Sequence, residues 1–290
     1  MATETKEVKE KKFNYRSDRK PIWCPGCGDH SVVAGLARAL EAMELNPADI
    51  AVVSGIGCSS RLPGYMSTYG FNSIHGRALP IATGLKLSRP EITVIAAGGD
   101  GDGFAIGGNH LMHAARRNID ITYLVMDNGI YGLTKGQVSP TTPLGLKTKT
   151  TAYGAYEKPI RPLEVMLAYG TTFVAQAYSA DLKRMTELIK EAIEYPGFSY
   201  VNIISPCVTY RGGKEMYQAL KAIMTRIEDS GHDVHDWEAA HRICCDAEKM
   251  HVGVIYKERR DTYLEIQHDL KEKAPHAEAP AVEDIADKYR

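Results

Sequence analysis

The chain has 290 residues, of which 44% are hydrophobic, and its 35 lysines and arginines nearly balance its 36 aspartates and glutamates. This balance gives no sign of the strong excess of basic residues that is typical of nucleic-acid-binding proteins. The apolar runs are of strand length, far short of the roughly twenty residues that a membrane-spanning helix needs. We therefore expect a globular protein of one or two domains that binds neither nucleic acid nor membrane.

The chain begins with MATETKEVKEKK, which is charged and lacks the apolar core of a targeting peptide. We expect residues 1–14 to form a disordered tail. A secretory signal is absent, and a chain of this length builds its core without disulfide bonds. We therefore expect the protein in a reducing cytoplasm.

Helix and strand patterns alternate through most of the chain. They predict helices at 31–43, 79–87, 104–117 and 180–195, and strands at 50–54, 92–97, 121–126 and 200–204. This alternation predicts an α/β fold with a doubly wound parallel sheet.

Two further stretches lack this alternation. Residues 131–161 are rich in threonine, glycine, proline and lysine, which predicts a functional or mobile segment. Its first part would lie against a bound cofactor, and 140–161 would be a lid, a contact between subunits or an ordinary surface loop. Residues 214–290 are charged, with a mostly helical pattern, and we expect them to form a mainly helical C-terminal extension.

An acidic glycine turn, Gly99-Asp100-Gly101-Asp102-Gly103, follows the strand at 92–97, and Asp127-Asn128 follows the next strand. Both lie at strand carboxyl ends, where ligands bind in open α/β sheets. Glycines let backbone N–H groups approach phosphate at the start of a helix, and a hard cation would offset repulsion between the aspartates and the phosphates. We therefore predict a diphosphate site built around Mg²⁺ or Ca²⁺.

Two other readings of this turn are weaker. A dinucleotide-binding turn requires G-x-G-x-x-G, and the spacing here is G-x-G-x-G. Aspartate, asparagine and glycine also form turns for purely local reasons, although their matched placement after two strands argues against that reading.

Six cysteines are present, and four of them lie in glycine- and proline-rich loops: Cys24 and Cys27 in WCPGCG, Cys58 in GIGCSS, and Cys207 in SPC. Four thiolates complete either a zinc site or an iron–sulfur cluster, and the wide scatter favours a cluster. A thioredoxin-like role for Cys24 and Cys27 stays open. Cys244 and Cys245 lie in a helical pattern and are expected to be ordinary helix thiols.

Gly99-Asp100-Gly101 followed by Asn128 is similar to the signature of the thiamine diphosphate-binding fold. The local sequences GDGDGFAIGG and VMDNGIYGLTKGQ resemble the β subunit of 2-oxoacid:ferredoxin oxidoreductases. The resemblance runs from about Tyr15 to about Gly213, and it implies a thiamine diphosphate- and Mg²⁺-binding domain with an iron–sulfur cluster over residues 15–213.

The resemblance also implies roles for individual residues. The Mg²⁺ ligands would be Asp100, the Asn128 side chain and the main-chain carbonyl of Ile130. A [4Fe–4S] cluster would be held by Cys24, Cys27, Cys58 and Cys207. The remaining cofactor contacts would be Gly57, Ser59, His75, Gly99, Gly101, Asp102, Tyr131, Leu133 and Thr134.

His75, Arg61 and Lys135 are the candidates for catalysis. His75 and Arg77 come just before the helix at 79–87, where they would reach phosphate or substrate, and the resemblance places His75 near the cofactor. Arg61 and Lys135 are candidates for pairing with a substrate carboxylate. The alternative for His75 is an ordinary core or surface histidine without a catalytic role. The alternative for Arg61 and Lys135 is that they are exposed surface charges.

The resemblance implies oxidative decarboxylation of a 2-oxoacid with coenzyme A, in which electrons leave one at a time through the cluster to ferredoxin. The segments GIGCSSRLPGY and FNSIHGRALPIATG resemble 2-oxoglutarate enzymes more than pyruvate enzymes, which implies succinyl-CoA and CO₂ as products, in either direction of carbon flow. Pyruvate or another 2-oxoacid is the alternative substrate. A thiamine diphosphate decarboxylase or synthase with structural zinc is an alternative enzyme, and a non-enzymatic electron-transfer or zinc-binding subunit is a third possibility.

A partner is also expected. The chain shows one diphosphate-type site, and the segment after Gly213 is short for a second complete domain. We therefore expect an α subunit to supply the pyrimidine-binding domain and the glutamate that activates the cofactor, in an α₂β₂ assembly.

Overall fold

The computed structural model describes residues 13–274 and 282–289. Most of the predicted N-terminal tail therefore lies outside the described residues. The last part of it is ordered, because the ring of Phe13 meets the ring of Tyr15 edge-on at 6.2 Å between centroids.

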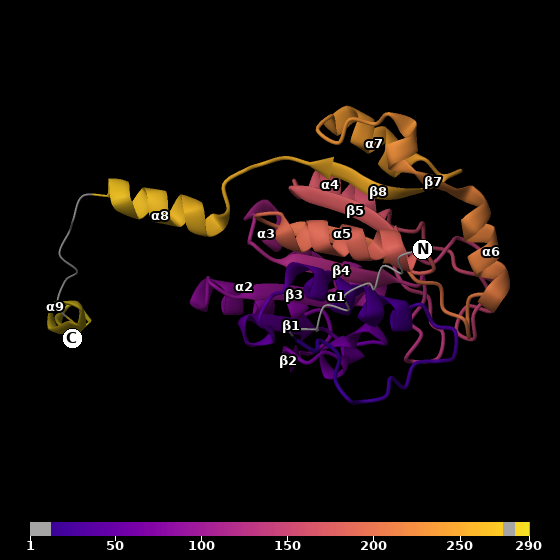
Figure 1. Ribbon diagram of the computed structural model, residues 1–290, viewed down its shortest axis with the longest axis horizontal. Helices are drawn as coiled ribbons and strands as arrows, with labels where there is room; N and C mark the ends of the chain where they lie inside the picture. The colour runs from indigo at the N-terminus through magenta and orange to yellow at the C-terminus, as the bar shows by residue number, and fades with distance from the viewer. Residues whose placement is uncertain (1–12, 275–281, 290) are drawn as a thin grey trace, which may run out of the picture.

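The strands form an eight-stranded sheet in the order β2-β1-β3-β4-β6-β5-β8-β7 (Figure 1). In chain order they are β1 Ile50–Ser54, β2 Tyr69–Asn72, β3 Thr93–Gly99, β4 Thr122–Asp127, β5 Phe173–Tyr178, β6 Ser199–Ile204, β7 Met224–Arg226 and β8 Met250–Lys257. Neighbouring strands are parallel except β5 and β8, which are antiparallel.

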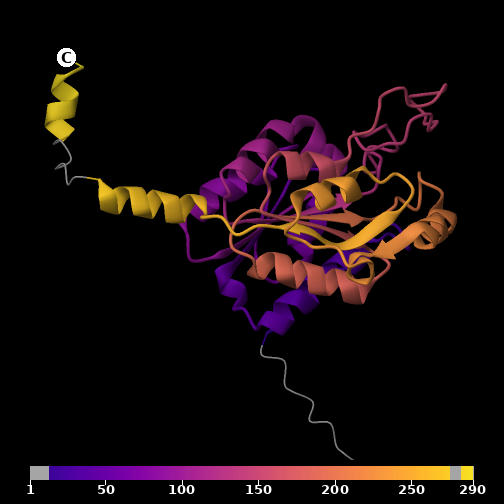
Figure 2. The ribbon, with the colours of Figure 1, turned by 90° about the horizontal axis from the view of Figure 1, so that it is seen from above.

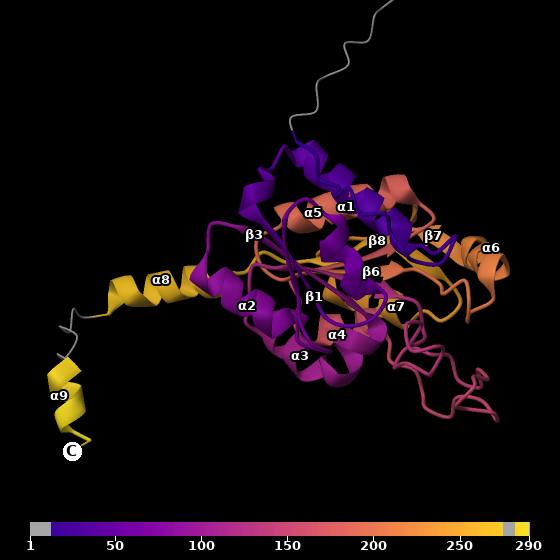
Figure 3. The same ribbon diagram turned by 90° about the horizontal axis from the view of Figure 1, so that it is seen from below.

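Helices cover both faces of the sheet (Figure 3). One face packs against α1 Asp29–Met43 and α5 Leu182–Glu194, and the other packs against α2 Ala78–Ser88, α3 Gly108–Arg116, α4 Pro162–Ala168 and α7 Trp237–Cys245. Alternate strand residues serve the two cores: in β4, Leu124 and Met126 face the first, and Tyr123 and Val125 face the second. Burial on both sides explains why the central strands read as continuous apolar runs.

The remaining helices are short or peripheral. They are η1 Pro47–Asp49, η2 Ser59–Tyr65, η3 Asp102–Ile106, α6 Gly213–Ile223, η4 Ile227–Ser230, α8 Tyr263–Lys273 and α9 Val282–Asp287. Helix α8 extends away from the sheet (Figure 1), and the irregular segment between β4 and α4 projects from the body (Figure 2). No helix in the described part of the chain has both the length and the apolar character needed to cross a membrane.

The predicted doubly wound sheet is confirmed, with two corrections. The sheet is not wholly parallel, because β8 runs antiparallel to β5. The mainly helical C-terminal extension also contains the strands β7 and β8, which add to the sheet.

The predicted helix at 104–117 is two elements. The N–H of Gly107 bonds the carbonyl of Asp102 at 3.1 Å, which makes a wide π-type turn over Asp102–Ile106 before α3 begins. This turn places the acidic glycine segment directly after β3.

Candidate functional site

A cavity of about 450 Å³ lies beyond the carboxyl ends of β1, β3 and β4. All the residues predicted to contact the cofactor or its Mg²⁺ line this cavity, together with Ile56, Cys58, Met126, Gly132, Gln137 and Val138. The sheet therefore brings together residues that are as far apart in sequence as Ile56 and Val138, as expected for parallel strands that end at one edge.

Two buried carboxylates face one hydroxyl at this edge. Thr141 Oγ1 lies 2.8 Å from Oδ2 of Asp100 and 2.9 Å from Oδ1 of Asp127, and its single proton serves only one of them at a time. Burial, and after it the negative charge of Asp127, raise the pKa of Asp100 to about 7. A bound cation would stabilise both charged forms, so these residues fit a metal site.

The backbone turns sharply after β4. Asn128 Oδ1 accepts a hydrogen bond from the N–H of Ile130 at 3.0 Å, and Gly129 adopts a φ of 65°, which favours glycine. The turn brings Asn128 and Ile130 to the same cavity as Asp100. Carboxylate, amide and carbonyl oxygens are the donors that Mg²⁺ prefers.

Asp102 supports the cavity wall. Its Oδ1 accepts hydrogen bonds from the N–H of Gly76 at 2.7 Å and from the N–H of Ile56 at 2.9 Å, and it lies 3.0 Å from Nδ1 of His75. Because a carboxylate only accepts, Nδ1 is the protonated ring nitrogen of His75, and Nε2 is left as the acceptor. Asp102 thereby fixes both the position and the tautomer of His75.

Close backbone approaches and unpaired polar atoms mark a site shaped for a polar ligand. A Cβ on Gly101 would lie 2.2 Å from the ring of Tyr131, and one on Gly55 would lie 2.0 Å from the Asp102 carboxylate, so neither position admits a side chain without displacement. Ser59 Oγ and Asp102 Oδ2 are buried without a hydrogen-bond partner. Because buried polar groups are almost always satisfied, the hydroxyl of Ser59, which lines the cavity, fits a hydrogen bond to a phosphate oxygen.

A second cavity, of about 230 Å³, is lined by the four predicted cluster cysteines, Cys24, Cys27, Cys58 and Cys207. In the described part of the chain, no three of their sulfur atoms all lie within 4.8 Å of one another. A single tetrahedral zinc, with Zn–S bonds of about 2.3 Å, would hold the sulfurs about 3.8 Å apart. The four sulfurs therefore do not have the close mutual spacing of a single tetrahedral zinc site.

The environment of these thiols differs from that of a redox-active C-x-x-C pair. Burial, followed by the negative charge of Asp29, raises the pKa of Cys58 to about 12 and raises that of Cys27 as well. Reactive cysteines of thioredoxin-like sites have lowered pKa values, so the thioredoxin-like alternative loses support.

The two cavities share a wall. Cys58, Asn128, Gly132 and Leu133 line both of them. A Cβ on Gly132 would lie 3.5 Å from Sγ of Cys58 and 3.7 Å from Sγ of Cys207, so the Gly132 backbone in this wall lies close to two of the cysteine sulfurs.

Arg61 and Lys135 line the cysteine cavity and do not line the 450 Å³ cavity. Lys135 adopts a φ of 78°, and its N–H bonds the carbonyl of Gly132 at 3.1 Å in a tight turn. The structure thus brings both cations beside the cysteines, on the far side of the shared wall from His75.

Comparison with known proteins also relates this chain to enzymes that use thiamine diphosphate. The family "Thiamine pyrophosphate enzyme, C-terminal TPP binding domain" matches residues 55–203, and the family of the C-terminal part of the pyruvate ferredoxin oxidoreductase beta subunit matches residues 207–272. The 2-oxoglutarate synthase subunit KorB of Methanocaldococcus jannaschii is 44% identical over 68% of this chain and 73% of its own length. The 2-oxoglutarate oxidoreductase subunit KorB of Mycobacterium tuberculosis is 44% identical over 72% of this chain.

A solved structure covers nearly the whole chain. It is described as "2-oxoglutarate:ferredoxin oxidoreductase from Magnetococcus marinus with 2-oxoglutarate, coenzyme A and succinyl-CoA bound", and it is 40% identical with a TM-score of 0.88 over 96% of this chain and 97% of that chain. The chain belongs to the β subunits of the 2-oxoacid:ferredoxin oxidoreductases.

This family assignment confirms the resemblance seen in the sequence motifs. The chain nevertheless spans less than two thirds of several curated β subunits of the family, for example 56% of the Mycobacterium tuberculosis protein and 64% of an Aeropyrum pernix 2-oxoacid:ferredoxin oxidoreductase subunit.

The structure adds residues to the β-subunit site that sequence reasoning missed. Thr141 contacts both buried aspartates. Near the cysteines, Trp23 Nε1 donates to the carbonyl of Cys58 at 2.8 Å, and Thr209 Oγ1 lies 3.3 Å from Sγ of Cys24. Thr141 belongs to the irregular segment 131–161, which was predicted to be functional or mobile. Trp23 could have been found from its place directly before Cys24 in the WCPGCG motif.

Proposed function

We propose that this chain is the thiamine diphosphate-binding β subunit of an enzyme that oxidatively decarboxylates 2-oxoglutarate to succinyl-CoA and CO₂ and passes the electrons to ferredoxin. The observation that carries this proposal is the shared wall between a cavity suited to a diphosphate and its metal and a cavity lined by four cysteines. A non-oxidative decarboxylase has no use for an electron acceptor at that place. The ligands named for the Magnetococcus marinus structure support 2-oxoglutarate and coenzyme A as substrates.

In this proposal Asp100, Asn128 and the carbonyl of Ile130 hold Mg²⁺, and Ser59 and the glycine turn bind the diphosphate. The four cysteines of the second cavity hold a [4Fe–4S] cluster. When bound, thiamine diphosphate supplies the electron sink for decarboxylation and the cluster accepts electrons one at a time.

His75 is the proton-handling residue of the proposal. Asp102 holds its Nδ1–H, which leaves Nε2 free to accept or return a proton. Its ring also meets that of Tyr131 edge-on at 6.0 Å, so two neighbours fix its orientation in the cavity wall. Arg61 and Lys135 are proposed to attract anionic substrate groups or to stabilise negative charge at the cysteines.

We also propose that the active site is completed by an α subunit in an α₂β₂ complex. The acidic side chains that line the cavity are Asp100 and Asp102, and both are engaged in the contacts described above, so the activating glutamate is assigned to the partner. Ile56 and Leu133, which line the cavity, are exposed, as are Tyr69, Phe71 and Ile74 at the adjoining edge of the sheet. Such exposed apolar side chains suit an interface between subunits.

The test is an anaerobic assay of the chain purified together with its α subunit. We expect reduction of ferredoxin that requires both 2-oxoglutarate and coenzyme A, with one succinyl-CoA formed per two ferredoxins reduced. Release of CO₂ without ferredoxin reduction would instead establish a non-oxidative decarboxylase.

Pyruvate is the second candidate substrate, because the family that matches residues 207–272 is named for a pyruvate enzyme. The ratio of kcat/KM for 2-oxoglutarate to that for pyruvate decides between them. We expect this ratio to exceed about ten, since a site built to pair with the second carboxylate of 2-oxoglutarate discriminates strongly against a substrate that lacks it.

A further inference from the structure

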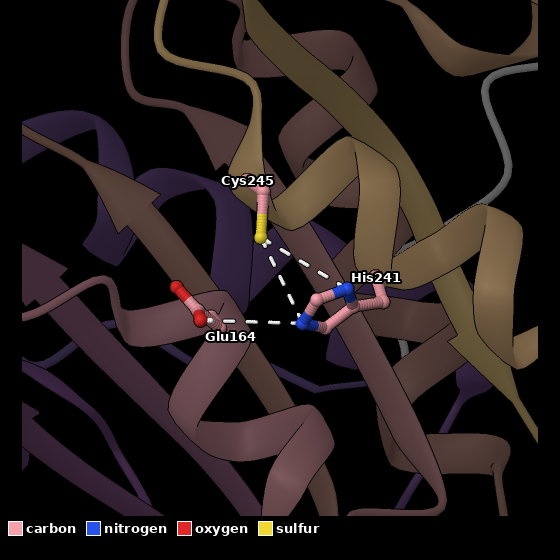
Figure 4. Close-up of side chains that lie close together, drawn as sticks. All are labelled: Glu164, His241 and Cys245. Atoms are coloured by element: carbon pink, nitrogen blue, oxygen red, sulfur yellow. Dashed lines mark hydrogen bonds and ion pairs between the residues drawn. The ribbon is translucent and has the colours of Figure 1, made fainter.

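Three potential metal ligands meet away from both cavities. Glu164 lies in α4, and His241 and Cys245 lie one turn apart in α7 (Figure 4). Within the described residues, they form the one group of three histidine, cysteine or acidic ligand atoms that all lie within 4.8 Å of one another. None of the three lines the diphosphate cavity or the cysteine cavity.

The spacing of the three atoms is close to that of a tetrahedral metal site. Cys245 Sγ lies 3.7 Å from His241 Nε2, and His241 Nε2 lies 4.0 Å from Glu164 Oε1. A zinc ion with a Zn–S bond of about 2.3 Å and Zn–N and Zn–O bonds of about 2.0 Å would hold these pairs about 3.5 Å and about 3.3 Å apart. The three ligand atoms all lie within 4.8 Å of one another, so rotation and small shifts of the side chains would bring them onto one ion.

The neighbouring side chains orient the ligands. The ring of Trp237 stacks on His241 at 5.3 Å with only 10° between the planes, which restricts rotation of the imidazole. Arg161 Nη1 lies 3.6 Å from Glu164 Oε2, which leaves Oε1 facing the histidine. On α7, the spacing from His241 to Cys245 places both side chains on one helix face.

We propose that Glu164, His241 and Cys245 bind one Zn²⁺ ion, with water as the fourth ligand. A thiolate, an imidazole and a carboxylate are the donors that zinc takes in proteins, whereas Mg²⁺ and Ca²⁺ prefer oxygen alone. Glu164 belongs to the thiamine pyrophosphate-binding match and the other two ligands belong to the separate C-terminal match. The ion would thus fasten the C-terminal segment to the cofactor-binding domain, and this inference does not depend on the proposed reaction.

The test uses zinc analysis and zinc K-edge X-ray absorption on the anaerobically purified complex, after loading with Zn²⁺ and removal of the excess. This edge is specific to zinc, so iron in the sample does not interfere. We expect one zinc per chain with one sulfur at about 2.3 Å and nitrogen or oxygen neighbours at about 2.0 Å. A shell of several sulfurs would instead mean zinc bound at the four cysteines and would overturn the proposal.

Variants complete the test. His241→Ala and Cys245→Ser are each expected to weaken Zn²⁺ binding at least tenfold, whereas the neighbouring Cys244→Ala and the surface His268→Ala are expected to leave it unchanged. Cys245→His keeps three ligands and is expected to retain zinc while the sulfur signal disappears. Equal Zn²⁺ affinity in the wild type and in both ligand variants would refute the site, because the bound zinc would then lie elsewhere.

Discussion

Asp100 and Asp127 illustrate how the diphosphate site brings two carboxylates close together. Their carboxylates share one hydroxyl donor, and both are buried. Such an arrangement costs stability in the free protein and becomes favourable when a cation arrives. Replacing a metal-binding carboxylate by a neutral residue is therefore expected to stabilise the protein without its metal and to destabilise the protein with its metal bound.

We predict that Asp100→Asn lowers the affinity for thiamine diphosphate and Mg²⁺ at least tenfold without lowering the stability of the free chain. The substitution removes one of two facing carboxylates, which relieves repulsion, but it also removes a charged metal ligand. Calorimetric titration and thermal unfolding measure the two effects separately. A ligand at 100 times its Kd adds about 2.7 kcal/mol of stability, and a tenfold weaker Kd at the same ligand concentration removes about half of this gain.

The exposed Asp18 provides the control for this prediction, since Asp18→Asn removes the same charge far from the metal ligands. It is expected to match the wild type in both experiments. A variant Asp100→Asn that is strongly destabilised but binds the cofactor normally would show that Asp100 has only a structural role.

Gly132 tests the shared wall. A Cβ there would sit at ordinary contact distance from two cysteine sulfurs, so Gly132→Ala should be tolerated, whereas the larger Gly132→Val would place methyl groups where the cluster is proposed. We predict that the valine variant loses at least half of its iron, measured by iron and sulfide analysis of the anaerobic protein. Gly84 on α2 has open space around its Cβ position, so Gly84→Val is the matched control. Full iron content in Gly132→Val would argue against a cluster beside this residue.

At the scale of elements, α8 begins with a complete capping box. Thr262 Oγ1 accepts from the N–H of Glu265 at 3.2 Å, and the Glu265 carboxylate accepts from the N–H of Thr262 at 2.7 Å. Because α8 extends from the body, this cap contributes mainly to the helix itself (Figure 1).

We predict that Thr262→Ala destabilises α8 by about 1 kcal/mol while leaving the unfolding temperature of the sheet unchanged. Hydrogen exchange should then be several-fold faster for the amides of residues 263–266 and unaltered in β3 and β4. The exposed Thr150→Ala serves as the control. Unchanged exchange in α8 would mean that its contacts with the body, such as the bond from Tyr263 N–H to the Asn118 carbonyl, already hold its first turn.

The strands that the sequence predicted are buried, although the equally buried β5, whose apolar run is interrupted by Gln176, was missed. Strands β1, β3, β4 and β6 are buried along nearly their whole length, which produces apolar runs that are visible without a structure. Strand β2 was missed because all four of its residues are exposed at the edge of the sheet. Strand β8 was missed because it lies within a charged, largely helical region and contains Gly253, which adopts a φ of 142°.

The residues of the candidate site also fall into two groups, those that the sequence predicted and those that only the structure revealed. Asp100, Asn128 and the four cysteines were predicted because each stands in a short local motif. Thr141 carries no such motif, and it reaches the aspartates only through the path of the segment after β4. The placement of Arg61 and Lys135 beside the cysteines likewise follows from three-dimensional folding. The chemical roles of all these residues stay predictions.

At the scale of the whole molecule, exposed apolar residues surround the 450 Å³ cavity. Their position fits a protein that functions within a complex. The family assignment as a β subunit agrees with this picture. The cofactor's activating glutamate is assigned to the α subunit, so the chain purified alone is expected to show no 2-oxoglutarate oxidation. Oxidation by the isolated chain at the rate of the complex would contradict that assignment.

The central claim is that two cofactors occupy adjoining cavities of this chain, and elemental and cofactor analysis of the anaerobic complex tests it most directly. We predict four irons with matching sulfide, one thiamine diphosphate and one Mg²⁺ per copy of this chain. A further zinc would belong to the site between α4 and α7. Zinc in place of iron would contradict the claim: together with thiamine diphosphate it would indicate a non-oxidative decarboxylase or synthase, and without it a non-catalytic subunit.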